Sequence, residues 1–253
     1  MSRVWQTRIA SHRGGALEWP ENSPTAFINT AKLPVDQVEF DIHPSSDGVL
    51  VVIHDPTLDR TTDGEGPVIA KSWAEIRRLR LTGTDGEAPL RLEELFEIFR
   101  ATEIALRLEI KPGVDFHLYQ GIELAVLKLL RDQAMHERTM ITSFFLEPLA
   151  RVRAIDPPEE MAWLVNPLVL RSVGGVTTCA SLAKRLGIDH LGLRQETVNS
   201  AVLDQALCSG VRLGAWATHE DDAIRRMLEL GVSLFTTDRP TAALQIRDQL
   251  GFA

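Results

Sequence analysis

The sequence alternates short apolar segments with amphipathic segments of helical period, and this alternation constrains the fold more than any other feature. Eight segments have the length and apolar character of buried strands, namely 8–12, 37–43, 105–111, 139–144, 160–165, 190–194, 212–218 and 232–238. Segments of helical period lie between them or follow the last one, namely 23–32, 90–100, 115–133, 146–155, 177–187, 200–210, 220–231 and 241–251. Repeated strand–helix units of this kind predict a parallel sheet covered by helices.

Residues that favour helix ends stand at the boundaries of several helical segments. Ser23 can cap the segment 23–32, and Pro24 then takes the first helical position, where its missing N–H does no harm. Four glycines stand where helices commonly end, namely Gly187, Gly210, Gly231 and Gly251. These boundaries support the same strand–helix rhythm.

Eight strand–helix units predict a closed (β/α)8 barrel, the TIM barrel, formed by residues 1–253 as a single domain. The length agrees, because single α/β barrels commonly have about 200–250 residues. A doubly wound open sheet is the structural alternative. However, the first strand–helix turn, SHRGGALEW, is not a GxGxxG fingerprint, and the acidic residue expected downstream of one is missing. The sequence therefore favours the barrel and argues against nucleotide binding.

The segment from 44 to 90 interrupts the rhythm after the second strand. It contains Asp-Gly pairs, which favour tight turns, at positions 47–48, 63–64 and 85–86. Its sequence predicts one short β element, VLVVIH, and one short helix. Insertions at the carboxyl-end face of a barrel commonly carry function, so we expect this insertion to contribute to a site.

Composition and charge exclude several classes of protein. The net charge of −8 argues against binding to nucleic acid or to an anionic membrane, since both favour a basic surface. No segment approaches the ~20 apolar residues of a membrane-spanning helix, and residues 1–10 lack the apolar stretch of a signal peptide. Cys179 and Cys208 lie outside any CxxC or His/Cys pattern, which indicates reduced thiols. We therefore expect a cytoplasmic protein without a membrane anchor, and the oligomeric state stays open.

Three carboxylates stand in predicted barrel strands, where a buried charge without a partner costs several kcal/mol. Glu39 and Asp41 are two residues apart in the second strand, so both side chains leave the same face. Glu109 stands in the neighbouring barrel strand. Three carboxylates this close must protonate or share a cation. Their oxygen-only set of ligands favours Mg²⁺ or Ca²⁺ over zinc.

Other charged side chains flank this predicted cluster and leave two interpretations. The first is a buried ion-pair network in which Arg13, Arg107 and Lys111 neutralise the carboxylates. The second is a metal-dependent catalytic site, because His12 ends the first strand and His54 follows the apolar run VLVVI of the insertion. The location at the carboxyl ends of the strands, where barrel enzymes hold their active sites, favours the catalytic site.

The motifs around these residues resemble those of the glycerophosphodiester phosphodiesterase family. They are HRG in the first strand, ENSPTAF after it, VEFDI in the second strand, IHDPTLDRTTDGEG in the insertion, LEIKP in the third strand, SF ending the fourth and FTTDRP ending the eighth. The resemblance extends over nearly the whole chain. It implies a TIM barrel with a small insertion after strand two. It also implies hydrolysis of glycerophosphodiesters to glycerol 3-phosphate and an alcohol, with a divalent cation.

Carried over to the matching positions, the resemblance implies roles for eight residues. The acid–base pair is His12 and His54, the metal ligands are Glu39, Asp41 and Glu109, and the substrate contacts are Arg13, Lys111 and Trp216. His43 shares a strand face with Asp41, and we expect it to line the site rather than to act as a third catalyst. The chain departs from the family pattern at Ser45–Ser46 and at 217–219, which concerns the leaving-group pocket and removes no catalytic group.

Several alternatives stay open at this point. The nucleophile is either the 2-hydroxyl of glycerol, which gives a cyclic phosphate that water then opens, or a directly bound water. The sequence does not choose between Mg²⁺ and Ca²⁺, between the two histidines as base, or among head groups. A lyase that stops at the cyclic phosphate is one rival, but its relatives are mostly secreted and disulfide-bonded. A phosphate-ester binding protein is another, although the sequence retains every expected histidine and carboxylate.

Overall fold

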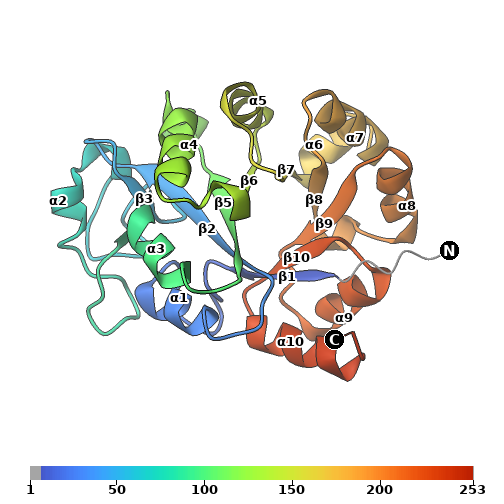
Figure 1. The fold of residues 1–253 in the computed structure, drawn as a ribbon, viewed down its shortest axis with the longest axis horizontal. Coiled ribbons are helices and arrows are strands. Elements are labelled where there is room, and N and C mark those ends of the chain that lie inside the picture. Colours follow the sequence, from blue (N-terminus) through green and yellow to red (C-terminus); the bar gives the residue numbers. More distant parts are fainter. Residues whose placement is uncertain (1–6, 253) are drawn as a thin grey trace.

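Eight parallel strands form a closed ring in the structure, a computed structural model that describes residues 7–252. The strands are β1 (Arg8–His12), β2 (Gln37–Pro44), β5 (Ala105–Ile110), β6 (Thr139–Ser143), β7 (Met161–Val165), β8 (His190–Arg194), β9 (Arg212–Trp216) and β10 (Leu234–Thr237). The ring closes because β1 pairs with both β10 and β2 (Figure 1). The predicted TIM barrel is therefore confirmed. The sequence predicts no signal peptide in residues 1–10, and residues 1–6 of that segment lie outside the described residues.

Helices surround the ring of strands (Figure 1). They are α1 (Pro24–Thr30), α3 (Leu92–Phe99), α4 (Ile122–Asp132), α5 (Leu146–Ile155), α6 (Pro167–Ser172), α7 (Val176–Arg185), α8 (Ser200–Cys208), α9 (Asp221–Leu230) and α10 (Pro240–Gln249). Short 3-10 helices are η1 (Val68–Ala70), η2 (Val114–Phe116), η3 (His136–Arg138) and η4 (Gln195–Thr197). Within residues 7–252, none of the helices has the length and apolar character needed to cross a membrane.

The predicted helix ends are present. The side chain of Ser23 accepts the N–H of Ala26 at 3.1 Å, and Pro24 opens α1. Gly231 ends α9 with a φ of 68°, a left-handed conformation that glycine adopts without strain. Cys179 in α7 and Cys208 in α8 are free thiols, the first buried and the second exposed.

Two helical segments differ from the predictions. The single helix predicted for 115–133 was wrong, because α4 begins only at Ile122. The preceding turn places Asp115 and Phe116 at φ values of 55° and 61°, which a right-handed helix cannot accommodate. The second difference is α6, a helix that was not predicted. It follows β7 directly and is capped by Asn166.

The insertion after β2 extends the sheet outside the ring. β3 (Leu50–Val52) pairs antiparallel with β2, and β4 (Leu90–Arg91) pairs antiparallel with β3. The short helix is α2 (Trp73–Ile76). A small apolar cluster of the insertion comprises Val51, Ile53, Leu58, Val68 and Ile76. The predicted β element and short helix are thus both present, and the insertion has buried contacts that fix its shape.

The apolar core lies between the strands and the helices. Phe27 of α1 packs edge-to-face against Phe40 of β2 and Phe99 of α3, with ring centroids 6.3 and 6.1 Å apart. Because side chains alternate along a strand, the neighbours of Phe40, namely Glu39 and Asp41, point into the barrel. The outer face of β2 therefore stabilises the fold, and its inner face is available for chemistry.

Strand register places charged residues of three strands side by side inside the ring. Asp41 of β2 stands opposite Glu109 of β5, and Glu39 stands opposite Arg107. His12, the last residue of β1, stands opposite Glu39 on the other side. The carboxyl ends of β1, β2 and β5 thus form one polar surface.

Candidate active site

Glu39, Asp41 and Glu109 converge at the carboxyl ends of β2 and β5. Each offers a carboxylate oxygen, and these oxygens all lie within 4.8 Å of one another. The side chains are buried, since the residues are 3%, 1% and 5% exposed. The structure therefore brings together the three residues that the sequence predicted as metal ligands, and we call them the carboxylate cluster.

The donors of the carboxylate cluster fit a hard divalent cation. Among the described residues, no hydrogen bond reaches Asp41 Oδ1 or Glu109 Oε1, although both are buried. The buried Oδ1 of Asn22 also lacks a partner there, while its Nδ2 donates to Asp41 at 3.4 Å. Buried oxygens are normally hydrogen-bonded, so these oxygens, which lack a hydrogen bond, fit a site for a cation that prefers oxygen ligands.

Neighbouring charges separate the pKa values within the cluster. Burial and the charge of Asp41 raise the pKa of Glu39 to about 7. Burial would raise the pKa of Asp41 too, but nearby positive charge, chiefly that of Lys111, outweighs burial and holds that pKa below its usual range. Glu39 is therefore less readily ionised than an ordinary glutamate, because burial and Asp41 outweigh the nearby basic side chains.

Lys111 and Arg13 pair with the cluster from two sides. Lys111 Nζ lies 3.1 Å from Glu109 Oε1 and 3.6 Å from Asp41 Oδ1. Arg13 Nε lies 3.6 Å from Asp41 Oδ2, and the backbone N–H of Arg13 donates to Glu39 at 3.2 Å. Both cations stand at the mouth of the barrel, where an anionic ligand would enter.

Arg107 lies inside the barrel and does not complete an ion-pair network. It makes no ion pair with a carboxylate in residues 7–252, and its Nη1 donates to Sδ of Met140 at 3.3 Å. Burial lowers its pKa to about 10, and its Nε has no hydrogen-bond partner among the same residues. The three-cation network that is the alternative to a metal site is therefore incomplete.

His12 lies between the carboxylate cluster and Asp238. Its Nδ1 is hydrogen-bonded to Asp238 Oδ1, and its Nε2 lies 3.8 Å from Glu39 Oε2. Burial lowers the pKa of His12, but Glu39 and Asp238 outweigh burial and raise it above the ordinary value. The backbone N–H of Asp238 donates to His219 Nδ1 at 3.0 Å, which helps to fix that aspartate.

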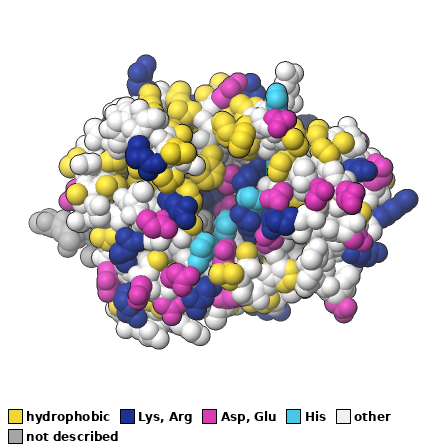
Figure 2. Space-filling model, turned by 180° about the vertical axis from the view of Figure 1, so that it is seen from behind, with side chains coloured by type: hydrophobic (Ala, Val, Ile, Leu, Met, Phe, Trp, Pro, Cys, Tyr) yellow, Lys and Arg dark blue, Asp and Glu magenta, His cyan; other side chains and the backbone are white. Residues whose placement is uncertain are grey.

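His54 reaches the same place from the insertion. Its Nδ1 lies 2.6 Å from Asp55 Oδ1, and its Nε2 lies 3.0 Å from Lys111 Nζ. Because an ammonium group only donates, Nε2 of His54 accepts that hydrogen bond and Nδ1 carries the proton. Each predicted catalytic histidine is therefore held at Nδ1 by an aspartate and faces the site with Nε2. Figure 2 shows histidine side chains gathered at a hollow that also contains acidic and basic side chains.

Arg60 connects the insertion to the loop after β1. It donates to both oxygens of Asp55 at 2.6 and 3.1 Å, and to both oxygens of Glu21 at 2.7 and 2.8 Å. Glu21 also accepts a hydrogen bond from Arg13 at 3.1 Å. Through Asp55, this double fork fixes the ring of His54 relative to β1.

His43 is buried and is held at both ring nitrogens. Its Nε2 lies 3.0 Å from the carbonyl oxygen of His54, and its Nδ1 lies 2.9 Å from the hydroxyl of Tyr119. Burial lowers the pKa of His43 to about 4, so the ring is neutral. Since the carbonyl only accepts, Nε2 donates and the hydroxyl of Tyr119 donates to Nδ1. This arrangement and the lowered pKa fit a supporting role for His43.

Trp216 ends β9 and is half-buried. Its Nε1 donates to the carbonyl of Gly192 at 3.2 Å, and its ring packs edge-to-face on Phe144 with centroids 5.4 Å apart. The guanidinium carbon of Arg194 lies 5.8 Å from the ring centroid. One face of the indole ring is thus already near a cation of the protein.

The sequence predictions assigned no role to Asp55, Asp238, His219 or Tyr119. A signal for the two aspartates was present, because Asp55 follows His54 directly in IHDPTLDRTTDGEG and Asp238 follows the last strand in FTTDRP. For His219 and Tyr119 no sequence pattern indicated a role. Their contacts depend on how distant loops meet at the mouth of the barrel.

Comparison with known proteins gives concordant matches. Residues 12–242 match the Glycerophosphoryl diester phosphodiesterase family. A glycerophosphodiester phosphodiesterase from Caldanaerobacter subterraneus subsp. tengcongensis is 30% identical over 246 residues, which cover 95% of this chain and 98% of that protein. One from Bacillus altitudinis is 28% identical and covers 96% of this chain and 99% of its own length.

Solved structures also superpose over nearly the whole length. One from Agrobacterium tumefaciens, assigned as a glycerophosphoryl diester phosphodiesterase, is 37% identical with a TM-score of 0.94, and the match covers 98% of this chain and 99% of that one. An Oleispira antarctica phosphodiesterase was solved with its product sn-glycerol-3-phosphate. It shares the fold at 21% identity and a TM-score of 0.82, over 95% of this chain and 96% of that one.

Proposed function

Because the chain belongs to the glycerophosphoryl diester phosphodiesterase family and is therefore a phosphodiesterase, we propose that it hydrolyses glycerophosphodiesters by metal-assisted acid–base catalysis. The products are glycerol 3-phosphate and an alcohol. One observation carries the proposal: three buried carboxylates converge between two histidines that are each hydrogen-bonded to an aspartate.

The carboxylate cluster of Glu39, Asp41 and Glu109 is the proposed binding site of the cation. Oxygen donors suit both Mg²⁺ and Ca²⁺. When bound, a divalent cation offsets the negative charge that grows on the phosphate oxygens during the reaction. The raised pKa of Glu39, caused by burial and by the charge of Asp41, fits a site where a bound cation would favour the ionised carboxylate.

Arg13 and Lys111 are the proposed phosphate-binding groups. Arg13 can present a planar guanidinium fork to two phosphate oxygens, whereas Lys111 presents a compact positive charge. Both side chains are less buried than the cluster, at 18% and 13% exposed, so a ligand can reach them. Their position at the mouth of the barrel supports this role.

His54 and His12 are the proposed base and acid. Nε2 of His54 accepts a hydrogen bond from Lys111, so it carries the lone pair that a base requires. It would take the proton of the nucleophile, for which both a water and the 2-hydroxyl of glycerol are suitable. His12 would then give a proton from Nε2 to the departing alcohol. Asp55 and Asp238 hold the two imidazoles and stabilise the charged ring as it forms.

The identity of the phosphorus products tests this function. We expect glycerophosphocholine, incubated with the protein and Mg²⁺ or Ca²⁺, to give glycerol 3-phosphate and choline. Phosphorus NMR identifies the phosphorus-containing product. A cyclic phosphate that accumulates and is not opened would instead identify a lyase. Binding of the diester without turnover, measured by calorimetry, would identify a binding protein.

A further inference from the structure

Apolar side chains line one side of the mouth of the barrel. They come from the segments that follow three adjacent strands, and we call them the apolar rim: Val114 and Phe116 after β5, Phe144 and Phe145 after β6, and Leu168 and Val169 after β7. Figure 2 shows hydrophobic side chains along the upper border of the hollow that contains the histidines.

The outer members of the apolar rim are unusually exposed. Phe116 and Leu168 are 75% and 68% exposed, the highest fractions among the large apolar side chains of residues 7–252. Phe116 stands on a turn in which it and Asp115 both have positive φ, a conformation that costs roughly 1–2 kcal/mol for each non-glycine residue. None of the six residues of α6, which carries Leu168, is buried. The fold thus holds apolar groups in solvent at a conformational cost.

The apolar rim is continuous with the chemical site. Phe116 packs against Phe145, with ring centroids 6.5 Å apart. The adjacent Phe144 packs on Trp216, and its ring centroid lies 6.0 Å from Lys111 Nζ. Since Lys111 contacts both His54 and Glu109, an apolar surface extends from the proposed phosphate position outward to Phe116.

The opposite side of the mouth is charged. The loop after β1 and the insertion place Arg13, Glu21, Asp55 and Arg60 there, linked to one another by hydrogen bonds. A ligand that fits both sides has a phosphate at one end and an apolar chain at the other. This amphipathic form matches a diester that carries its own hydrocarbon chain.

We propose that the preferred substrates carry an acyl chain on the glycerol, so that the chain lies along the apolar rim while the phosphate occupies the site. This proposal rests on the proposed function and specifies its substrate class. In the net reaction, water adds to phosphorus and the bond from phosphorus to the head-group oxygen breaks. The head-group alcohol takes one proton of the water, and the acylglycerol phosphate keeps the oxygen and the remaining proton.

A pair of substrates that differ only in the acyl chain tests the proposal. The probes are glycerophosphocholine and 1-lauroyl-glycerophosphocholine, the latter kept below its micelle concentration, and choline release is measured for both. We expect kcat/KM to be at least about ten-fold higher for the lauroyl ester, because chain burial on the rim contributes to binding.

Variants of the rim make the test specific. Phe116→Ser and Leu168→Ser are each expected to lower kcat/KM for the lauroyl ester by about five- to ten-fold, and for glycerophosphocholine by less than about two-fold. Leu124→Ser is the matched control, because Leu124 is a 58% exposed leucine on α4 outside the rim. It is expected to change neither rate.

The failures of the two proposals are distinguishable. If the wild type hydrolyses glycerophosphocholine but shows no preference for the lauroyl ester, the acyl-chain proposal is wrong and the proposed function stands. If neither substrate is hydrolysed, the proposed function fails. A preference that appears only above the micelle concentration would assign the rim to a lipid surface, and a dimer that dissociates in Phe116→Ser would assign it to a second copy. Either result overturns the acyl-chain proposal.

Discussion

Each proposed catalytic histidine is oriented by a carboxylate that comes from a different part of the fold. Asp55 is the next residue after His54, whereas Asp238 is 226 positions away from His12 in the sequence. Both aspartates bind Nδ1, so Nε2 of His12 faces Glu39 and Nε2 of His54 faces Lys111. Fixing the tautomer in this way is how a carboxylate makes an imidazole an effective acid or base.

Removal of either ring should reduce the chemical step. We expect His12→Ala and His54→Ala each to lower kcat by at least ~10²-fold, the lower end of what a positioned acid or base contributes. Steady-state hydrolysis of glycerophosphocholine measures this, and His117→Ala, an exposed histidine, is the control. A folded variant that retains near wild-type turnover would reassign that histidine to a structural role.

Trp216 should contribute to substrate binding through apolar contact with the glycerol carbons. Trp216→Ala is expected to raise KM by roughly ten-fold, since about 1.4 kcal/mol of lost contact is one decade. Because Arg194 already lies near one face of the indole, choline and ethanolamine esters should be affected equally. An unchanged KM together with a lower Tm would show that Trp216 only packs the rim of the barrel.

At the scale of the elements, the insertion matters because it supplies His54 from outside the ring of strands. β3 attaches the insertion to β2, and Arg60 attaches it to the loop after β1 through two bidentate contacts. Lys cannot reproduce this geometry, because its ammonium is a point charge without a planar fork.

Arg60→Lys should therefore misplace His54 without unfolding the protein. We expect kcat to fall by roughly ten-fold, because small displacements of a catalytic group are costly, while Tm changes little at this half-exposed site. Arg78→Lys, an exposed arginine of the same insertion, is the matched control. Equal rates for the two variants would contradict the positioning role of Arg60.

The elements that the sequence predicted best are those whose burial has a regular period. The strands at 8–12 and 190–194 were predicted with the bounds that the structure has, because an apolar run bounded by polar residues defines a buried strand. The break before α4 was not predicted, because Asp115 and Phe116 adopt left-handed conformations that their residue types do not indicate. Tertiary packing, rather than local preference, decides such conformations.

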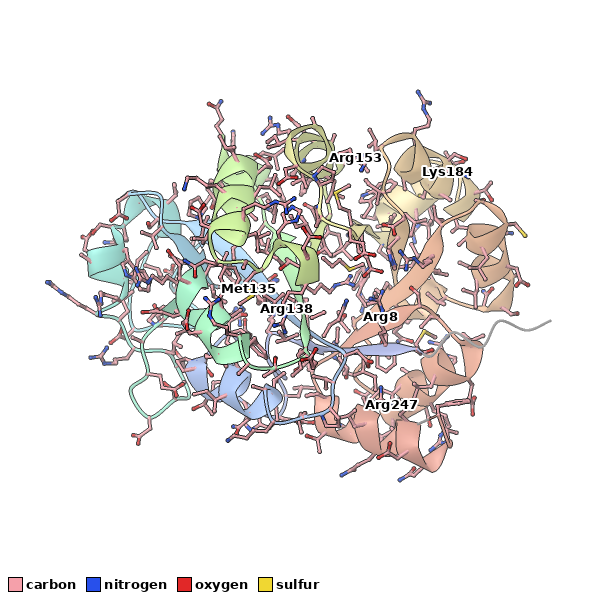
Figure 3. All side chains as sticks on the ribbon, viewed as in Figure 1. Arg8, Met135, Arg138, Arg153, Lys184 and Arg247 are labelled. Carbon is pink, nitrogen blue, oxygen red and sulfur yellow. The ribbon has the colours of Figure 1, made fainter. Side chains whose placement is uncertain are left out.

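At the scale of the whole molecule, the two ends of the barrel differ in function. The carboxyl ends of the strands hold the candidate active site, and the amino ends hold a compact network of charged side chains. There Glu160 pairs with Arg8 at 2.8 Å and with Arg212 at 2.9 Å, and it accepts a hydrogen bond from His190 at 3.2 Å. Arg8, labelled near the centre of the ring in Figure 3, joins β1 to this network. Asp189 lies beside His190 and Arg212, so the acidic groups here are matched by arginines.

Glu160 should make stability depend on pH. Burial would raise its pKa, but the hydrogen bonds from His190 and Arg8 outweigh burial and lower it well below 4.5. Its contribution is then fully present above the unfolded pKa and is lost as pH falls through the folded value. The lowered pKa of His190, caused chiefly by burial, acts in the same direction below pH 6.5. Acid should therefore weaken the amino end of the barrel.

Glu160→Gln is expected to lower stability at pH 7 by about 1–2 kcal/mol, since charge-assisted hydrogen bonds are lost. The difference in Tm between wild type and variant should shrink as the pH falls from 5 to 3. Thermal unfolding followed by circular dichroism measures this, with Glu159→Gln, an exposed neighbour, as the control. A difference that stays constant with pH would contradict the role of Glu160.

The candidate site was predictable where neighbouring strands carry it and unpredictable where distant loops meet. Glu39, Asp41 and Glu109 follow from alternate spacing on paired strands, which sequence shows directly. The contacts of Asp238 and Tyr119 follow only from the closure of the ring and from the turn before α4. No periodic pattern in the sequence indicates these long-range contacts, so the roles of Asp238 and Tyr119 could be identified only from the structure.

The central claim is that a divalent cation bound by the carboxylate cluster makes phosphodiester hydrolysis possible. The most direct measurement is the rate of glycerol 3-phosphate release from glycerophosphocholine by chelator-treated protein, as Mg²⁺ or Ca²⁺ is added back. We predict no turnover in excess EDTA, saturable recovery with the cation, and recovery shifted to higher cation concentration in Glu109→Gln. Full activity in excess EDTA would contradict the claim.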